Sequence, residues 1–122
     1  MYELVVRRKF DAAHYLRGYA GDCANLHGHT WQVELRLRAT QLLGDMLVDF
    51  KVVKRRLDDI LPDHKCLNEV YFFNPTAENL AKHLYDEFEV PDCCCLVSVT
   101  VWESADCGAT YYGDTRKKAN CQ

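Results

Sequence analysis

A strict alternation of side chains between positions 27 and 39 is the feature that most constrains the fold of this chain. One set of alternate positions is apolar apart from two histidines: His27, His29, Trp31, Val33, Leu35, Leu37 and Ala39. The intervening set is mostly polar or charged: Thr30, Gln32, Glu34, Arg36 and Arg38. Successive side chains of a β-strand point to opposite faces, so the pattern predicts a long strand with one buried face.

The remaining segments predict an α+β fold. Further strands are expected at 2–10, 46–50, 95–104 and 109–114, the last two forming a hairpin. Apolar residues at helical spacing predict helices over 51–61 and 74–88, and residues 14–26 and 62–73 are expected to be loops. This order favours an antiparallel sheet with two helices on one face. Because the edges of such a sheet carry unpaired backbone groups, we expect a symmetric oligomer.

Composition excludes several classes of protein. A chain of 122 residues that is 48% hydrophobic and carries a net charge of −3 is expected to fold as one globular domain, with residues 116–122 forming a polar tail. The charge argues against a nucleic-acid-binding module. No apolar run reaches the ~18 residues that cross a bilayer, and the N-terminus does not resemble a signal peptide, so we expect a cytoplasmic protein. The seven cysteines do not have the spacing of a disulfide framework.

The stretch "CANLHGH" at 23–29 indicates a metal site. His27 and His29 lie two residues apart on the predicted strand, so their imidazoles point to the same side. If the first two strands pair, His14 in "FDAAH" lies beside them. Three neutral imidazoles with an open fourth position are typical of catalytic zinc. Cys23 has two interpretations: a fourth ligand that closes a structural site, or a base beside an open one.

Three other residues are candidates for catalysis or ligand binding. Asp63 precedes His64 in a predicted loop, where the carboxylate can orient the imidazole; an ordinary turn is the alternative. Glu103 continues the apolar face of the strand at 95–104. A carboxylate there can accept paired N–H donors from a guanidine-like heterocycle, unless it simply reaches solvent at the strand end.

A set of motifs resembles the 6-pyruvoyl-tetrahydropterin synthase family, and within it the bacterial 6-carboxytetrahydropterin synthases. The motifs are "FDAAH", "CANLHGH", "VDF", "DHKCLN", "NPTAEN" and the glutamate of "VWES". They run in order from Phe10 to Tyr111, within a single domain expected at 1–115. The resemblance implies the tunnelling fold (T-fold), in which four-stranded antiparallel sheets of several subunits join into a barrel, commonly as a hexamer.

The resemblance also implies residue roles. His14, His27 and His29 match the ligands of one zinc ion per subunit, Cys23 matches the catalytic cysteine, and Asp63 with His64 matches the acid-base pair. Glu103 matches the carboxylate that grips the pterin, and Thr76 a pterin-contacting position reached across a subunit interface. The implied reaction converts 7,8-dihydroneopterin triphosphate to 6-carboxytetrahydropterin, a queuosine precursor, with release of acetaldehyde and triphosphate.

Three alternatives stay open. The motifs do not separate the carboxy-forming enzyme from the pyruvoyl-forming enzyme, which eliminates triphosphate without cleaving the side chain. A non-enzymatic oligomerisation module with Cys23 as fourth zinc ligand would need none of Asp63, His64 or Glu103. A metal-free pterin-binding protein would carry no zinc.

Overall fold

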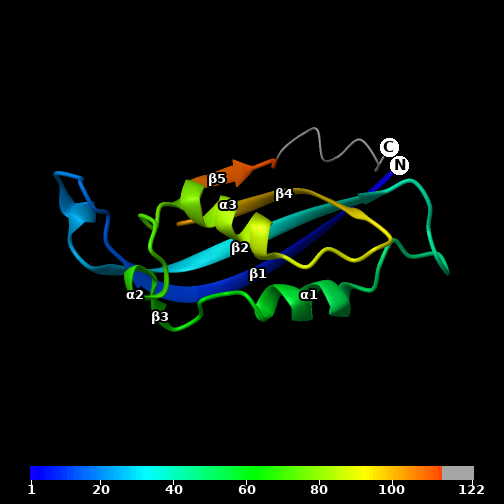
Figure 1. Cartoon of the computed structure of the whole chain (residues 1–122), viewed down its shortest axis with the longest axis horizontal. Helices are drawn as coiled ribbons and strands as arrows, with labels where there is room; N and C mark the ends of the chain where they lie inside the picture. Colours follow the sequence, from blue (N-terminus) through cyan, green and yellow to red (C-terminus); the bar gives the residue numbers. More distant parts are fainter. Residues whose placement is uncertain (114–122) are drawn as a thin grey trace.

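A five-stranded sheet in the order β3-β1-β2-β4-β5 forms the body of the molecule (Figure 1). The computed structural model describes residues 1–113, so the tail predicted at 116–122 lies outside the described residues. The strands are β1 (Tyr2–His14), β2 (His27–Ala39), β3 (Lys65–Cys66), β4 (Cys95–Trp102) and β5 (Gly108–Tyr111). Neighbouring strands are antiparallel except β3, which pairs with β1 in parallel.

Side-chain caps start the two longer helices. The helices are α1 (Phe50–Asp58), α2 (Leu67–Val70) and α3 (Ala77–Glu87), and a 3-10 turn, η1, spans Asp22–Ala24. The Asp49 carboxylate accepts a hydrogen bond from the Lys51 backbone N–H at 2.9 Å and starts α1. The Thr76 hydroxyl accepts from the Asn79 backbone N–H at 3.1 Å and starts α3. No helix within residues 1–113 is long and apolar enough to span a membrane.

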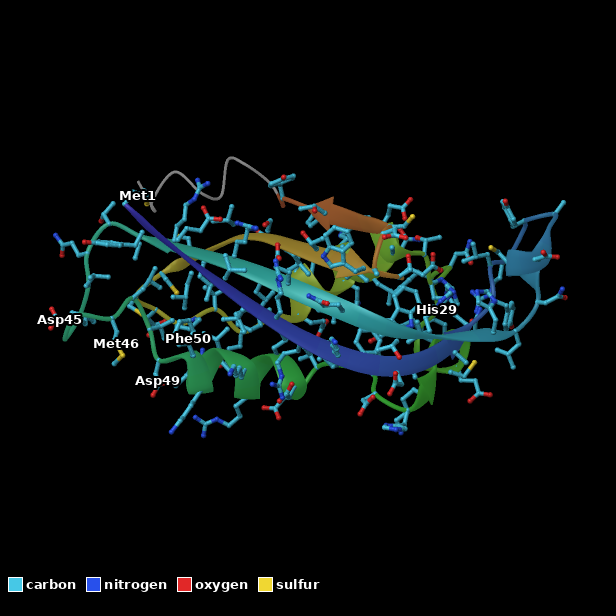
Figure 2. All side chains as sticks on the ribbon, turned by 180° about the vertical axis from the view of Figure 1, so that it is seen from behind. Met1, His29, Asp45, Met46, Asp49 and Phe50 are labelled. Carbon is cyan, nitrogen blue, oxygen red and sulfur yellow. The ribbon has the colours of Figure 1, made fainter. Side chains whose placement is uncertain are left out.

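The core lies between the helices and one face of the sheet. The apolar set of β2 is buried as predicted, and Val33, Leu35 and Leu37 have no exposed surface. Leu57 of α1 and Leu84 of α3 are fully buried against this face. Figure 2, which views the molecule from behind, shows β1 and β2 in front of the helices. Burial of each such leucine stabilises the fold by about 1.5–3 kcal/mol.

The other face of the sheet carries paired charges. Glu34 of β2 is 5% exposed, and its carboxylate contacts the Nε atoms of Arg7 at 2.8 Å and Arg36 at 3.1 Å. Glu3 contacts Arg36 at 3.2 Å and Arg38 at 3.1 Å. Charged side chains of the polar set therefore form a row of ion pairs across β1 and β2.

The structure corrects four details of the sequence-based prediction. The sheet has five strands because the segment at 62–73, expected to be a loop, contains β3 and α2. The strand predicted at 46–50 is absent: Met46 makes an isolated bridge to Leu43, and the Asp49 cap turns the chain into α1 at Phe50. β1 runs four residues beyond Phe10, to His14. α1 ends at Asp58 rather than at residue 61.

Candidate metal centre and catalytic residues

Pairing between β1 and β2 brings the three predicted histidines together. His14 lies opposite His27, and His29 lies opposite Ala12. All three imidazoles therefore project to the helix-covered face of the sheet. The ring centroids are 4.6 Å apart for His14 and His27, 4.8 Å for His27 and His29, and 5.1 Å for His14 and His29. Figure 2 shows His29 at the end of the sheet opposite Met1 and Phe50.

Backbone carbonyls set the tautomers of two of these rings. The Nδ1 atom of His14 lies 2.8 Å from the carbonyl oxygen of Pro75, and that of His27 lies 2.6 Å from the carbonyl oxygen of Asn25. A carbonyl oxygen only accepts, so each Nδ1 carries the proton and donates it. The Nε2 lone pairs are then free to bind a metal, as in many zinc sites where a second group orients the ligand.

The Nε2 atoms have no hydrogen-bond partner that explains their burial. Those of His14 and His29 are buried and make no hydrogen bond within residues 1–113. Burial lowers the pKa of His29 below its usual value and outweighs the nearby Glu103 carboxylate, which raises it. The ring is thus held neutral, as a metal ligand requires. Buried imidazole nitrogens that make no hydrogen bond, at this spacing, fit a zinc ion.

Trp31 packs on the inner side of the cluster. Its indole is fully buried and donates from Nε1 to the Ala12 carbonyl oxygen at 3.2 Å. The ring lies edge-to-face with His14 at 4.9 Å and with His29 at 5.4 Å. These contacts restrict the rotation of both imidazoles, so the cluster is preorganised.

Glu103 lies against the histidines, directly after the end of β4. Its Oε1 atom is 3.1 Å from Nε2 of His14 and 3.2 Å from Nε2 of His29, and the side chain is 35% exposed. Together with His27 these groups place four potential ligand atoms within 4.8 Å of one another. The carboxylate therefore stands within reach of the metal position as well as of solvent.

Cys23 lies outside this cluster. It sits in η1, is half-buried, and its carbonyl oxygen accepts from the Leu16 backbone N–H at 2.8 Å. Its sulfur is not among the groups of potential ligand atoms that lie within 4.8 Å of one another in residues 1–113. The fourth donor that the structure brings to the imidazoles is Glu103, which disfavours the closed site with Cys23 as ligand.

Asp63 and His64 form the predicted pair at the edge of β1. Asp63 Oδ2 lies 3.0 Å from His64 Nδ1, while its Oδ1 accepts from the Asp11 backbone N–H at 2.9 Å. The Asp11 N–H, together with His64, lowers the pKa of Asp63 below its usual value. His64 has a φ of 58°, in the left-handed region, and its N–H donates to the Asp11 carbonyl oxygen at 2.7 Å.

The Asp63–His64 pair lies beside Asp11, whose side chain belongs to the face of the sheet opposite the histidine cluster. Asp11, which clusters with Asp63 and His64, receives a hydrogen bond from the Thr30 hydroxyl at 2.5 Å. Thr30 follows His29 on β2, so the two side chains point to opposite faces. An open depression of about 600 Å³ lies at this end of the sheet, and His29 and His64 are among the residues that line it.

Thr76 lies next to the carbonyl that orients His14. Its hydroxyl is engaged as the N-cap of α3. The sequence-based prediction missed Asp11, Asn25 and Pro75 because they act on the site through backbone atoms, which leave no side-chain signature. His83 lies outside the histidine cluster, and its ring contacts that of Tyr71 in a tilted arrangement with the centroids 4.6 Å apart.

Comparisons with known proteins identify the family of the chain. The family model described as 6-pyruvoyl tetrahydropterin synthase matches residues 3–114. A curated 6-carboxy-5,6,7,8-tetrahydropterin synthase of Synechocystis is 33% identical over 112 residues, covering 84% of this chain and 87% of that protein. One from Rickettsia bellii is 35% identical over 105 residues, covering 66% and 75%.

Solved structures give the same answer for the fold. The 6-pyruvoyl tetrahydropterin synthase of Caenorhabditis elegans superposes with a TM-score of 0.76 and 27% identity over 93% of this chain and 98% of that one. A Wolinella succinogenes protein has a TM-score of 0.77 at 19% identity, over 93% and 98% of the two chains, and supports the fold alone. The predicted tunnelling fold is confirmed, with one more strand than expected. This chain belongs to the 6-pyruvoyl tetrahydropterin synthase family.

Proposed function

We propose that the chain is a zinc-dependent 6-carboxytetrahydropterin synthase that converts 7,8-dihydroneopterin triphosphate to 6-carboxy-5,6,7,8-tetrahydropterin, with release of acetaldehyde and triphosphate, in queuosine biosynthesis. One observation carries this proposal most directly. His14 and His29 present buried Nε2 atoms that make no hydrogen bond, beside His27, in a chain of the pterin synthase family. The curated relatives cited above favour the carboxy-forming product.

The metal-binding role falls to His14, His27 and His29. Bound zinc supplies Lewis-acid polarisation of the substrate's side-chain hydroxyls, which acidifies the neighbouring C–H and O–H bonds. The carbonyls of Pro75 and Asn25 engage Nδ1 of His14 and His27, so the Nε2 atoms of these rings would be the ones to hold the ion. Trp31 excludes water from the inner side of the cluster.

Proton transfer is assigned to Cys23, Asp63 and His64. The Cys23 thiolate removes a proton from the substrate side chain, and His64 serves as the second acid-base group. Asp63 accepts from His64 Nδ1 and so presents Nε2 to the substrate. The lowered pKa of Asp63 keeps its carboxylate ionised throughout the neutral range, as this orienting role requires.

Pterin binding is assigned to Glu103 and Thr76. The Glu103 carboxylate accepts the paired N–H donors of the amino-pyrimidinone edge in a bidentate arrangement. With zinc bound, the Nε2 atoms that Glu103 now faces would serve as metal ligands, and the Glu103 carboxylate would be left for the pterin. Thr76, at the start of α3, lies beside the Pro75 carbonyl at the rim of the cluster.

We propose that a second copy of the chain completes the site. Within one chain the Asp63–His64 pair clusters with Asp11, whose side chain lies on the face opposite the imidazoles, so the same pair of a neighbouring subunit is a candidate to serve the metal. β5 is an edge strand of the described sheet, and its exposed backbone groups suit pairing with another subunit. A homo-oligomer, proposed as a hexamer, brings the pair of one subunit to the histidines of another; light scattering in solution tests its size.

The test of the reaction is incubation of zinc-loaded protein with 7,8-dihydroneopterin triphosphate, followed by mass spectrometry of the products. The proposal predicts 6-carboxytetrahydropterin, acetaldehyde and triphosphate. The likeness to the Caenorhabditis elegans 6-pyruvoyl enzyme makes pyruvoyl formation the second candidate, which would release triphosphate without acetaldehyde. No turnover by zinc-loaded oligomer would refute both.

A further inference from the structure

Two asparagine side chains hold the first residues of the loop at 15–26. Asn68 accepts from the Tyr15 backbone N–H at 2.9 Å and donates from Nδ2 to the Tyr15 carbonyl oxygen at 2.9 Å. Asn74 repeats this arrangement two residues later: it accepts from the Arg17 N–H at 2.9 Å and donates to the Arg17 carbonyl oxygen at 3.2 Å. Each amide therefore satisfies both backbone groups of one residue, as a neighbouring strand would.

The Arg17 side chain reinforces this attachment. Its Nη1 atom donates to the Phe72 carbonyl oxygen at 2.8 Å, and Nη2 lies 3.5 Å from the Asn68 carbonyl oxygen. The partners lie more than 50 residues away in sequence, on the segment between β3 and α3. The loop start is thus fixed by tertiary contacts and not by its own local structure.

These contacts reach the candidate site at two points. Leu16 lies between Tyr15 and Arg17, and its backbone N–H donates to the Cys23 carbonyl oxygen at 2.8 Å. This hydrogen bond joins the start of the loop to the cysteine. Pro75, the residue after Asn74, accepts from His14 Nδ1 at 2.8 Å. One short segment therefore holds both a proposed metal ligand and the base of the loop that carries Cys23.

We propose that Asn68 and Asn74 are positioning residues that fix the Cys23 thiol relative to the histidine cluster. This inference rests on the proposed function, in which Cys23 moves a proton at a metal-bound substrate. A proton-transfer group contributes only when it lies within hydrogen-bond reach of the proton it removes. Displacement of a reacting group by about 1 Å can lower the rate by about 100-fold.

The test compares Asn68→Ala and Asn74→Ala with a matched amide deletion, Gln41→Ala, at an exposed position far along the sheet. The isosteric variants Asn68→Asp and Asn74→Asp keep the shape but lose the N–H donor. These aspartate variants allow the same test if either alanine variant fails to fold. Two quantities are measured on the zinc-loaded protein: kcat and KM with dihydroneopterin triphosphate, and the alkylation rate of Cys23 relative to exposed Cys107.

We expect kcat to fall by about 10- to 100-fold in the Asn68 and Asn74 variants, with KM and zinc content little changed. The Cys23 alkylation rate should rise several-fold relative to Cys107, because the loop is released. General destabilisation would also raise the alkylation rate of Cys94, which is half-buried outside this loop, whereas release of the loop alone would not. The inference is overturned if the variants match Gln41→Ala in both measurements, or if their activity falls only in proportion to lost zinc.

The alkylation measurement needs no substrate. Suppose that the wild type fails to turn over dihydroneopterin triphosphate but the relative alkylation rate of Cys23 rises in the variants. The proposed reaction is then wrong, and the positioning by Asn68 and Asn74 stands. If the variants turn over substrate normally and the relative alkylation rate of Cys23 does not rise, the reaction stands and the positioning role is wrong.

Discussion

Zinc added to chelator-treated protein is expected to raise its melting temperature, and His29→Ala is expected to abolish most of that rise. In the metal-free chain the Nε2 atoms of His14 and His29 are buried without a hydrogen bond. Each such group costs about 1–3 kcal/mol, which coordination would remove. The His29 side chain is 26% exposed whereas that of His14 is fully buried, so truncation of His29 removes one ligand with less disturbance of the core.

The size of the rise follows from linkage. A ligand present at about 1,000 times its Kd stabilises the folded state by about 4 kcal/mol. An unfolding entropy of about 2.1 cal/mol/K per residue gives about 260 cal/mol/K for 122 residues, so the melting temperature should rise by about 16 °C.

Differential scanning fluorimetry across a zinc titration measures this shift. His83→Ala is the matched control, because His83 packs on Tyr71 and Phe73 away from the cluster and should leave the shift intact. The reasoning fails if zinc does not move the wild-type melting temperature, or if His29→Ala responds as strongly as the wild type.

Three further predictions concern single side chains. Glu103→Gln should keep its zinc but lose pterin affinity in equilibrium binding; loss of zinc would instead make Glu103 a metal ligand. Asp63, whose pKa is lowered, stabilises the fold above pH about 4 and loses this contribution as the pH falls. Asp63→Asn should therefore be less stable than wild type at pH 7, with the gap closing by pH 2 in denaturant titrations; a constant gap would contradict the pairing. Burial and the adjacent Cys93 raise the pKa of Cys94 to about 12, so peptide mapping after alkylation at pH 8 should show Cys107 modified well before Cys94.

The long strands and the main helix could be predicted because their patterns span many residues. The alternation from His27 to Ala39 gives β2 with its observed bounds, and apolar residues at helical spacing predict α3 and α1, although the Asp49 cap of α1 lies in a segment expected to be a strand. β3 and α2 are too short for any periodicity to show, and they form because Lys65 and Cys66 pair with β1. Their existence depends on tertiary contacts that sequence spacing does not encode.

The histidine cluster could be predicted for a similar reason. Two histidines at strand spacing and a third at the end of the preceding strand must meet once β1 and β2 pair. The alternation placed Glu103 on the apolar face, but its contact with His14 and His29 was not predicted, because Glu103 lies beyond the last residue of β4 and its position depends on the turn that follows. The roles of Cys23, Asp63, His64, Glu103 and Thr76 stay predictions.

The most direct test of the proposed function compares the wild type with Cys23→Ala, with zinc per subunit quantified and triphosphate release measured from 7,8-dihydroneopterin triphosphate. We predict that the variant keeps its zinc and its fold but loses triphosphate release, and that the wild type also forms acetaldehyde. Loss of zinc together with the thiol, in a wild type that turns over nothing, would contradict the account and make the metal site structural.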